Sequence, residues 1–200
     1  MDRQSGPEAP DPVSGAAEGH RTRRHDPDRR GRLVDVTLDV IAEHGVAGTT
    51  HRRVAEAADV PLGSMTYHFT GIDDLLAAAF TKLASTTADC FEAALADARN
   101  IGEAREAVVG LITGTLLGSQ RHALLSYELY ALAARRPEVR TVTDAWMTRS
   151  RAALERHFDP PTSAMLDALM EGLAIHRGLA LIPLPEDRVR EAVARITAAA

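Results

Sequence analysis

The stretch from Thr50 to Phe69 constrains the fold of this chain more than any other. Thr50 is expected to begin a short helix, because its hydroxyl can accept hydrogen bonds from the unpaired amides of the first turn. Asp59-Val60-Pro61 then interrupts the helical pattern: Asp tolerates the left-handed conformation that ends a helix, and Pro suits the first turn of the next one. The stretch therefore predicts two short helices joined by a tight turn.

Apolar residues mark the inner faces of these two helices. Val54, Ala55 and Ala58 recur at helical spacing on the first, and Met65 and Phe69 lie four residues apart on the second. The residues left near the outer surface of the second helix are Leu62, Gly63, Ser64, Thr66, Tyr67 and His68. Such a pair is typical of a helix-turn-helix, whose second helix enters the major groove of DNA. The spacing alone fits an ordinary helical hairpin with a solvated polar face equally well.

Residues 33 to 76 resemble the amino-terminal domain of the tetracycline-repressor (TetR-like) family of bacterial transcriptional regulators. The residues that carry the resemblance are a helix from Leu33 to His44 ending at Gly45, then Thr50-His51-Arg52-Arg53-Val54-Ala55, Val60, Gly63-Ser64-Met65, Tyr67-His68-Phe69 and Asp73-Asp74-Leu75-Leu76. The resemblance implies an all-α fold, in which a three-helix domain with a helix-turn-helix precedes a larger helical domain for effector binding and dimerisation. It also implies a ligand-responsive regulator, usually a repressor, that binds a palindromic DNA operator.

The resemblance assigns roles to individual residues. Thr50, Arg52, Tyr67 and His68 match positions that commonly contact phosphates. The expected DNA-binding residues are these four, together with Arg53 and with Leu62, Gly63, Ser64 and Thr66 around the recognition helix. Three positions depart from the family pattern: Asp59 replaces the usual turn Gly, Thr66 stands where a phosphate-binding Tyr is usual, and Ile72 replaces a Lys. The change at Ile72 removes one expected phosphate contact.

The chain around this motif divides by composition. Residues 1–26 contain too few large apolar residues to offset the entropy of ordering and are expected to be disordered. Asp26 before Pro27 predicts the start of the first helix, so we expect the DNA-binding domain over 27–71 and the second helical domain over 72–200. Arginines cluster at this junction, at Arg21, Arg23, Arg24, Arg29, Arg30 and Arg32. The cluster fits an arm that contacts phosphates or the minor groove, and it fits a solvated charge cluster equally well.

Helical periodicity continues through the second domain. We expect helices over 73–97, 102–119, 122–135, 138–158, 162–182 and 186–198, with Pro137 and the Pro160-Pro161 pair as stops. The helix over 162–182 is apolar on most of its surface and must therefore be covered on more than one side. We expect it to form a homodimer interface with the helix over 186–198, as the resemblance implies. The alternative is that both helices fill the core of a monomer.

Polar and aromatic side chains interrupt the apolar faces of these helices, as they do around a site for a small-molecule effector. The candidates are His122, Tyr127, Tyr130, Trp146 and His176, with Glu128 and Arg177 nearby. An apolar lining favours a hydrophobic or amphipathic ligand, and a His or Arg could meet a carboxylate. Each residue taken alone is also explained as a hydrogen-bonded core or surface residue.

Other functions are weighed by charge and by the motifs that the sequence lacks. The net charge of −5 does not exclude DNA, because residues 71–200 hold 14 Lys and Arg against 17 Asp and Glu and so carry most of the acid excess. Cys90 is the single cysteine and cannot form an internal disulfide or a metal framework. No catalytic constellation, metal spacing or phosphate loop stands out, so we expect neither an enzyme nor a cofactor.

The sequence also predicts where the protein is located, and it leaves one main alternative for its function. No apolar run reaches about 20 residues and the chain begins without a signal peptide, which predicts a cytoplasmic protein with no membrane span. A helical dimer that binds small molecules or proteins, but no specific DNA, is the alternative to a regulator. Gel-shift measurements with promoter DNA separate the two.

Overall fold

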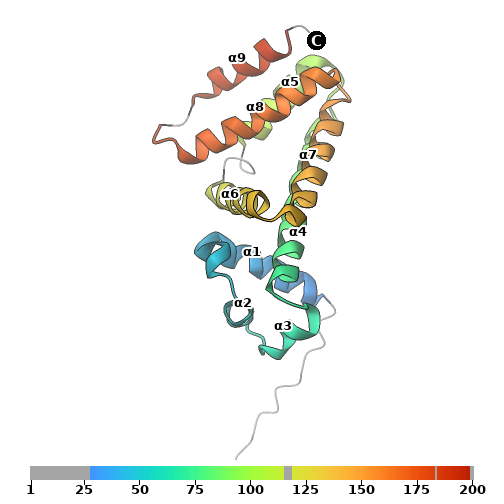
Figure 1. Ribbon diagram of the computed structural model, residues 1–200. Helices are drawn as coiled ribbons and strands as arrows, with labels where there is room; N and C mark the ends of the chain where they lie inside the picture. Colours follow the sequence, from blue (N-terminus) through green and yellow to red (C-terminus); the bar gives the residue numbers. More distant parts are fainter. Residues whose placement is uncertain (1–27, 115–118, 183, 199–200) are drawn as a thin grey trace, which may run out of the picture.

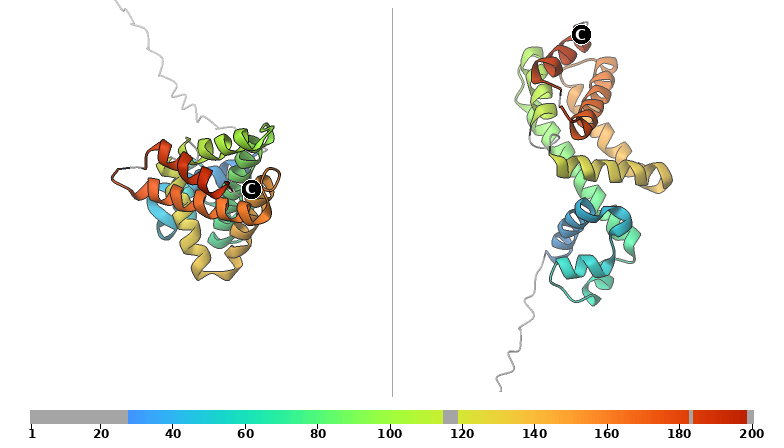
Figure 2. Two further views of the ribbon diagram at one scale, coloured as in Figure 1. Left: turned by 90° about the horizontal axis from the view of Figure 1, so that it is seen from above. Right: turned by 90° about the vertical axis from the view of Figure 1, so that its left-hand side faces the viewer.

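The computed structural model describes residues 28–114, 119–182 and 184–198, and all regular structure in these ranges is helical (Figure 1). The all-α prediction is confirmed. A small group of helices, α1 to α3, lies at one end of the molecule, and a larger group lies at the other. The long helix α4 connects the two, and α6 lies crosswise between them (Figure 2).

The small end consists of α1 (Arg29–Gly48), α2 (His51–Ala57) and α3 (Gly63–His68). The helical path of α1 breaks at Gly45, whose φ of 69° lies in the left-handed region that favours glycine, so the helix is interrupted where the sequence predicts its end. The predicted start at Asp26 and Pro27 lies outside the described residues. We call α1 to α3 the reading head from here on.

Two long helices run side by side through the middle of the molecule. These are α4 (Ile72–Ala96) and α7 (Arg140–Leu154), which follows the short 3-10 helix η1 (Pro137–Val139). The sequence predicts a single helix over 138–158 ended by Pro160-Pro161; α7 lies within this range but ends at Leu154, so the prediction that the prolines end it is wrong. The two prolines instead begin α8, because Asp159 accepts a hydrogen bond from the Thr162 amide at 2.8 Å and a proline in the first turn loses no intrahelical bond.

The larger end consists of α5 (Ile101–Thr113), α6 (Gln120–Arg135), α8 (Pro160–Leu179) and α9 (Glu186–Ile196). The helix predicted over 102–119 ends at Thr113, and residues 115–118 lie outside the described ranges. The helix predicted over 162–182 ends at Leu179, so Leu181 and Ile182 belong to an exposed connection. The last helix, predicted over 186–198, agrees with α9 to within two residues.

Buried apolar side chains form two separate clusters. The lower core joins the reading head to the first half of α4, to α6 and to the start of α7. The upper core joins the end of α4 to α5, α8, α9 and the end of α7. Among the described residues, only α4 and α7 contribute buried side chains to both cores, so these two helices continue across the boundary between them.

Candidate functional sites: the reading head and a cavity between the two cores

The local interactions predicted from the sequence stabilise the two helices of the helix-turn-helix. The Thr50 hydroxyl accepts from the Arg53 amide at 3.2 Å and so caps α2. Asp59 has a φ of 51°, so this residue adopts the left-handed conformation for which the family pattern has a glycine. Met65 and Phe69 are 0% and 2% exposed, so their side chains fix the inner face of α3. The departure at Asp59 therefore leaves the turn intact.

Arginines at the start of α1 make stabilising contacts with other parts of the reading head. The Arg32 guanidinium donates to the Ala58 carbonyl at 3.1 Å, and the Arg30 guanidinium lies 5.0 Å from the centre of the Phe69 ring. Arg29, Arg30 and Arg32 of the arginine cluster lie in the first turn of α1. The other three arginines of the cluster lie outside the described residues.

The predicted DNA-binding residues occupy one outer side of α2 and α3. Thr50, Arg52, Arg53, Leu62, Gly63, Thr66 and Tyr67 are exposed, and Ser64 and His68 are half-buried. Tyr67 is 84% exposed, and its ring lies edge-on to that of His68 at 4.9 Å. A Cβ added at Gly63 would meet no atom of the protein within 4 Å, so the start of α3 offers an open edge to a partner.

Two of these polar side chains are already engaged within the head. The Arg53 guanidinium donates to the Gly48 carbonyl, and the Thr66 hydroxyl donates to the Gly63 carbonyl at 3.1 Å. Arg52 has no ion-pair partner among the described residues and projects into solvent. Arg52 is therefore the arginine of this surface that is available to a phosphate.

The start of α4 is acidic where the family pattern has a lysine. Ile72 packs against the lower core instead of reaching outward. Asp73 pairs with Arg136, and Asp74 accepts from the Thr70 amide at 3.0 Å. This end of α4 is thus tied into the protein, and the phosphate contact that a lysine would add is absent.

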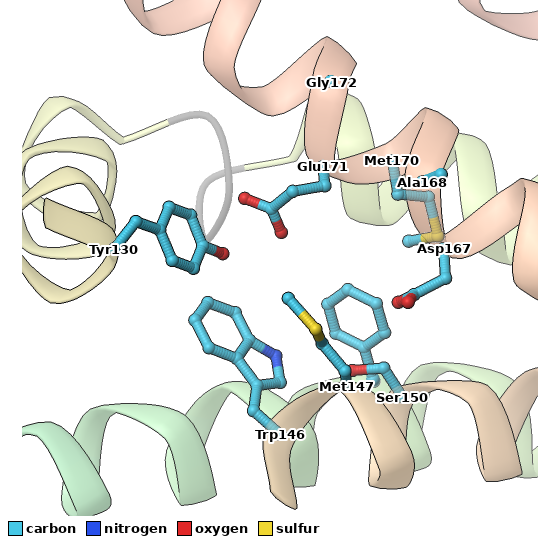
Figure 3. Close-up of a pocket in the computed structure, with 10 residues that line it drawn as sticks. Tyr130, Trp146, Met147, Ser150, Asp167, Ala168, Met170, Glu171 and Gly172 are labelled. Carbon is cyan, nitrogen blue, oxygen red and sulfur yellow. The ribbon is translucent and has the colours of Figure 1, made fainter. Parts of the chain in front are cut away.

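A cavity of about 390 Å³ lies between α7 and α8, at the boundary of the two cores (Figure 3). Its aromatic wall combines Phe91 of the upper core with Tyr130 and Trp146 from the lower side. The Tyr130 and Trp146 rings stack with centroids 6.1 Å apart and an angle of 19° between their planes. The remaining lining side chains are Met147, Ser150, Asp167, Ala168, Met170 and Glu171, beside Gly172.

The cavity is acidic. Burial raises the pKa of Glu171, the hydrogen bond with Tyr130 lowers it, and the nearby charge of Asp167 raises it again. Burial also raises the pKa of Asp167, against the effect of Arg151, whose Nε lies 3.8 Å from a carboxylate oxygen of Asp167. Glu171 has no cationic partner among the described residues. The lining contains two carboxylates and no Lys, Arg or His.

A second, much smaller cavity of about 10 Å³ lies against α6. It is lined by His122, Ala123, Ser126, Tyr127, Ala174 and Ile175, and it shares Trp146 and Glu171 with the large cavity. Burial, followed by the charge of Arg121, lowers the pKa of His122 to about 4, so this imidazole is neutral at physiological pH. The Tyr127 hydroxyl donates to the Ile175 carbonyl at 3.1 Å.

The structure brings four of the five predicted effector residues together. His122 and Tyr127 line the small cavity, Tyr130 lines the large one, and Trp146 lines both. His176 lines neither and is exposed in the last turn of α8. The expected basic partner for a carboxylate is also missing, because Arg177 donates instead to the Leu184 carbonyl at 3.3 Å.

Four polar lining residues were not predicted from the sequence. Ser126 and Ser150 are 5% and 2% exposed, and neither hydroxyl has a hydrogen-bond partner in the described part of the chain. Asp167 and Glu171 lie four residues apart on one face of α8. Acidic residues at this spacing also form the solvated side of many amphipathic helices, so the sequence carries no signal that distinguishes them.

Helix α6 connects the cavities to the reading head. Glu128 accepts a hydrogen bond from the Val46 amide at 2.9 Å, just after the break at Gly45. Arg121 pairs with Asp39 of α1 at 2.6 Å. Because the same helix carries Tyr127 and Tyr130 on the cavity side, a shift of α6 changes both sites together.

Two further findings hold for the described residues. None of their helices is long and apolar enough to cross a membrane. They contain no group of three or more His, Cys, Asp or Glu side chains that could hold a metal ion.

Known proteins and protein families match both halves of the chain. Residues 33–79 match the model for bacterial regulatory proteins of the tetR family, and residues 99–199 match the tetracyclin repressor-like, C-terminal domain. The chain is 27% identical over 176 residues to the HTH-type transcriptional regulator BetI 1 of Chromohalobacter salexigens, covering 82% of this chain and 86% of that protein.

Solved structures are similar over most of their length. The protein SCO7518 from Streptomyces coelicolor A3(2) is 51% identical, with a TM-score of 0.80 over 86% of this chain and 99% of that one. The multidrug binding protein EbrR, complexed with malachite green, is 37% identical, with a TM-score of 0.71 over 86% of this chain and 99% of that one. With its helix-turn-helix, its helical second domain and these relatives, the chain belongs to the tetracycline-repressor family of transcriptional regulators.

Proposed function

We propose that this regulator is a homodimeric repressor that binds a palindromic operator and is released by a small hydrophobic cation. The observation that carries the proposal is the position of α6, which lines the ligand cavities on one side and holds α1 of the reading head on the other. Ligand and DNA therefore act on a shared element. The location expected for such a regulator is the cytoplasm.

The exposed side of α2 and α3 is the proposed DNA surface. Arg52, Tyr67 and His68 contact phosphates, together with Thr50 and Arg53 at the start of α2. The open edge at Gly63 lets the start of α3 approach base edges, where Leu62, Ser64 and Thr66 lie beside it. Because the lysine contact at the start of α4 is missing, affinity depends more heavily on Arg52.

A second copy of the chain is the proposed partner of α8 and α9. One side of α8 packs on the upper core through Leu166, whereas Met165 and Leu179 on the outer side are 49% and 67% exposed. The apolar surface continues into the connection, where Leu181 and Ile182 are 102% and 87% exposed. Exposed apolar surface of this extent marks an interface. A palindromic operator needs two heads, about 34 to 36 Å apart in dimers of this kind.

The cavity chemistry favours a cation as the effector. Glu171 offers a carboxylate with no cationic partner among the described residues, and the rings of Tyr130, Trp146 and Phe91 offer π faces that attract positive charge. The relative EbrR has been crystallised with malachite green, proflavin and ethidium, all of which are aromatic cations. A ligand of this class would fit the acidic, aromatic wall better than a carboxylate would.

Release of DNA follows from the boundary position of the cavity. A ligand between the two cores contacts Phe91 and Met170 above and Tyr130 and Trp146 below, and therefore favours one relative arrangement of the cores. Helix α6 passes that preference to α1 through Glu128. The ligand can shift the equilibrium only by its difference in affinity for the two arrangements, commonly about 1 to 3 kcal/mol.

Fluorescence anisotropy with labelled DNA from the promoter next to the coding region tests this function. The dimer is expected to bind that DNA above random sequence at moderate salt. Saturating malachite green, whose twisted rings do not intercalate between base pairs as ethidium and proflavin do, is expected to weaken binding about 5-fold to 150-fold. If no DNA competes above random sequence, the chain acts as a small-molecule-binding or protein-binding module instead. If DNA binds but malachite green leaves the affinity unchanged, the proposed switch is wrong.

Variants locate the DNA surface in the same assay. Arg52→Ala is expected to weaken binding to specific and random DNA alike and to lower the salt dependence by about one phosphate contact. Tyr67→Ala is expected to weaken it without that change in salt dependence. Arg156→Ala removes an equally exposed arginine far from the reading head and serves as the control. Equal binding by all three variants would contradict the assignment.

A further inference from the structure

The small cavity against α6 holds a polar group that has no hydrogen-bond partner among the described residues. Ser126 is 5% exposed, and its hydroxyl makes no hydrogen bond with any described residue. A serine in the middle of a helix normally satisfies its hydroxyl on the carbonyl four residues earlier or in solvent, and leaving it buried and unpaired is costly. The cavity that this hydroxyl lines is therefore the place where a missing partner belongs.

The groups around Ser126 complete a hydrogen-bonding site. His122 lies one helical turn earlier on α6 and lines the same cavity. Burial holds the pKa of His122 at about 4, so the neutral imidazole has one nitrogen that accepts a hydrogen bond. Tyr127 is occupied by the Ile175 carbonyl at 3.1 Å. Ser126 and His122 can thus both accept from one small donor.

The size and the walls of this cavity limit what can enter. Its volume of about 10 Å³ is close to that of one water-sized group, which is too small for a ring. Trp146 and Glu171 line both cavities, so the small one adjoins the large one across the Trp146 side chain. The Trp146 ring meets the His122 ring edge-on at 6.2 Å on one side and stacks on Tyr130 on the other.

We propose that the two cavities form one binding site, in which the large cavity holds an aromatic cation and the small one receives an amino group carried by that ring. The inference rests on the proposed function, because it refines the class of effector to amino-substituted aromatic cations. The amino group donates to Ser126 and His122, while the ring lies against Trp146 with its charge near Glu171. Aromatic cations without such a donor still bind in the large cavity, but leave Ser126 unpaired.

The discriminating experiment uses two dyes with the same ring system. Proflavin carries amino groups that donate hydrogen bonds, whereas in acridine orange these amines are fully methylated. Dissociation constants for both are measured by fluorescence titration of the full-length protein in the absence of DNA. The quantity of interest is the dissociation constant of acridine orange divided by that of proflavin, because effects on the shared ring cancel in this ratio.

Ser126→Ala is expected to weaken proflavin binding about 3-fold to 10-fold, the loss of one neutral hydrogen bond, and to leave acridine orange within about twofold. Ser126→Val, which fills the small cavity with methyl groups, is expected to give the same selective loss. Ser150→Ala is the matched control, because it removes the other buried, unpaired hydroxyl from the large cavity only. It is expected to leave the ratio unchanged. Circular dichroism verifies that each variant is folded.

The outcomes separate this inference from the proposed function. If the wild-type protein binds both dyes and Ser126→Ala and Ser126→Val leave their ratio unchanged, the small cavity is not part of the ligand site and the inference is overturned. The cationic effector would then still stand. If the wild-type protein binds neither dye, the cationic effector itself is wrong, and the inference falls with it. A ratio that falls in both Ser126 variants but not in Ser150→Ala supports the inference.

Discussion

The lower core and the boundary between the two cores differ in how completely their side chains are packed. In the lower core, large side chains such as Phe80, Leu33 and Met65 are 0% exposed and are surrounded by other side chains. At the boundary with the upper core, side chains instead surround a cavity that contains two carboxylates and an unpaired serine hydroxyl. The lower core is therefore closely packed, whereas the boundary keeps polar side chains beside an open cavity.

The largest expected difference concerns two phenylalanines on α4. Phe80→Ala in the lower core is expected to lower the free energy of unfolding by about 3 to 5 kcal/mol, through lost burial and a new void. Phe91→Ala is expected to cost less, because that side chain already faces the cavity. Urea unfolding measures both. Equal losses would mean that the boundary is packed as tightly as the lower core.

Acid is expected to act on the boundary through His122. Burial, aided by the charge of Arg121, holds the folded-state pKa near 4, below the ordinary value of about 6.5. His122 therefore leaves the free energy of unfolding unchanged above pH 6.5. As the pH falls toward 4, this free energy drops by on the order of 3 kcal/mol, because the imidazole is protonated more readily in the unfolded chain. His122→Gln should flatten this part of the pH profile in urea unfolding at pH 7.5 and 4.5. An unchanged profile would show that His122 charges as freely as in the unfolded chain.

Two glycines give a matched pair for the reading head. Gly45→Ala places a side chain at a φ of 69° and its Cβ 2.9 Å from a carboxylate oxygen of Glu128, so we expect a loss of about 2 kcal/mol in stability. Gly63→Ala meets open space and is expected to change stability by less than about 0.5 kcal/mol, yet to weaken DNA binding. Thermal unfolding and anisotropy measure the two effects. If Gly63→Ala leaves DNA affinity intact, α3 does not approach DNA closely at this point.

The smallest expected change in stability comes from the cavity itself. Because burial raises the pKa of Glu171, its ionisation opposes folding, and the penalty appears as pH rises through the folded-state pKa. Glu171→Gln is expected to raise stability at pH 8, where the ionised carboxylate opposes folding, and to weaken ethidium binding. The gain in stability is expected to disappear near pH 4. Glu155→Gln, at an exposed position, is the control. A variant that keeps full ethidium affinity would exclude Glu171 as the counter-ion.

Prediction from the sequence succeeded where a signal is completed within a few residues. The Thr50 cap, the left-handed Asp59 and the inward pair Met65 and Phe69 are each decided by neighbours within one or two turns. It failed at Pro160, since a proline stops one helix and starts another equally well. The choice depended on Asp159, which accepts from the Thr162 amide.

The ligand site could be predicted only in part. Tyr130 and Trp146 stood out because they interrupt otherwise apolar helix faces. Asp167 and Glu171 resemble the solvated side of an amphipathic helix when read along the sequence. Only the packing of α7 against α8 turns that side toward a cavity.

The sequence by itself determined the helices, the tight turn of the reading head and the residues that its outer side presents. Helical hydrogen bonds close within four residues, so local chemistry is sufficient for them. The tertiary structure decided that Glu128 accepts a hydrogen bond from the Val46 amide beside the break in α1, 82 positions away, and that two cores meet around an acidic cavity. Such contacts depend on the way in which the long helices pack across one another. The spacing of residues along the sequence does not reveal this packing, because the residues in contact lie on different helices.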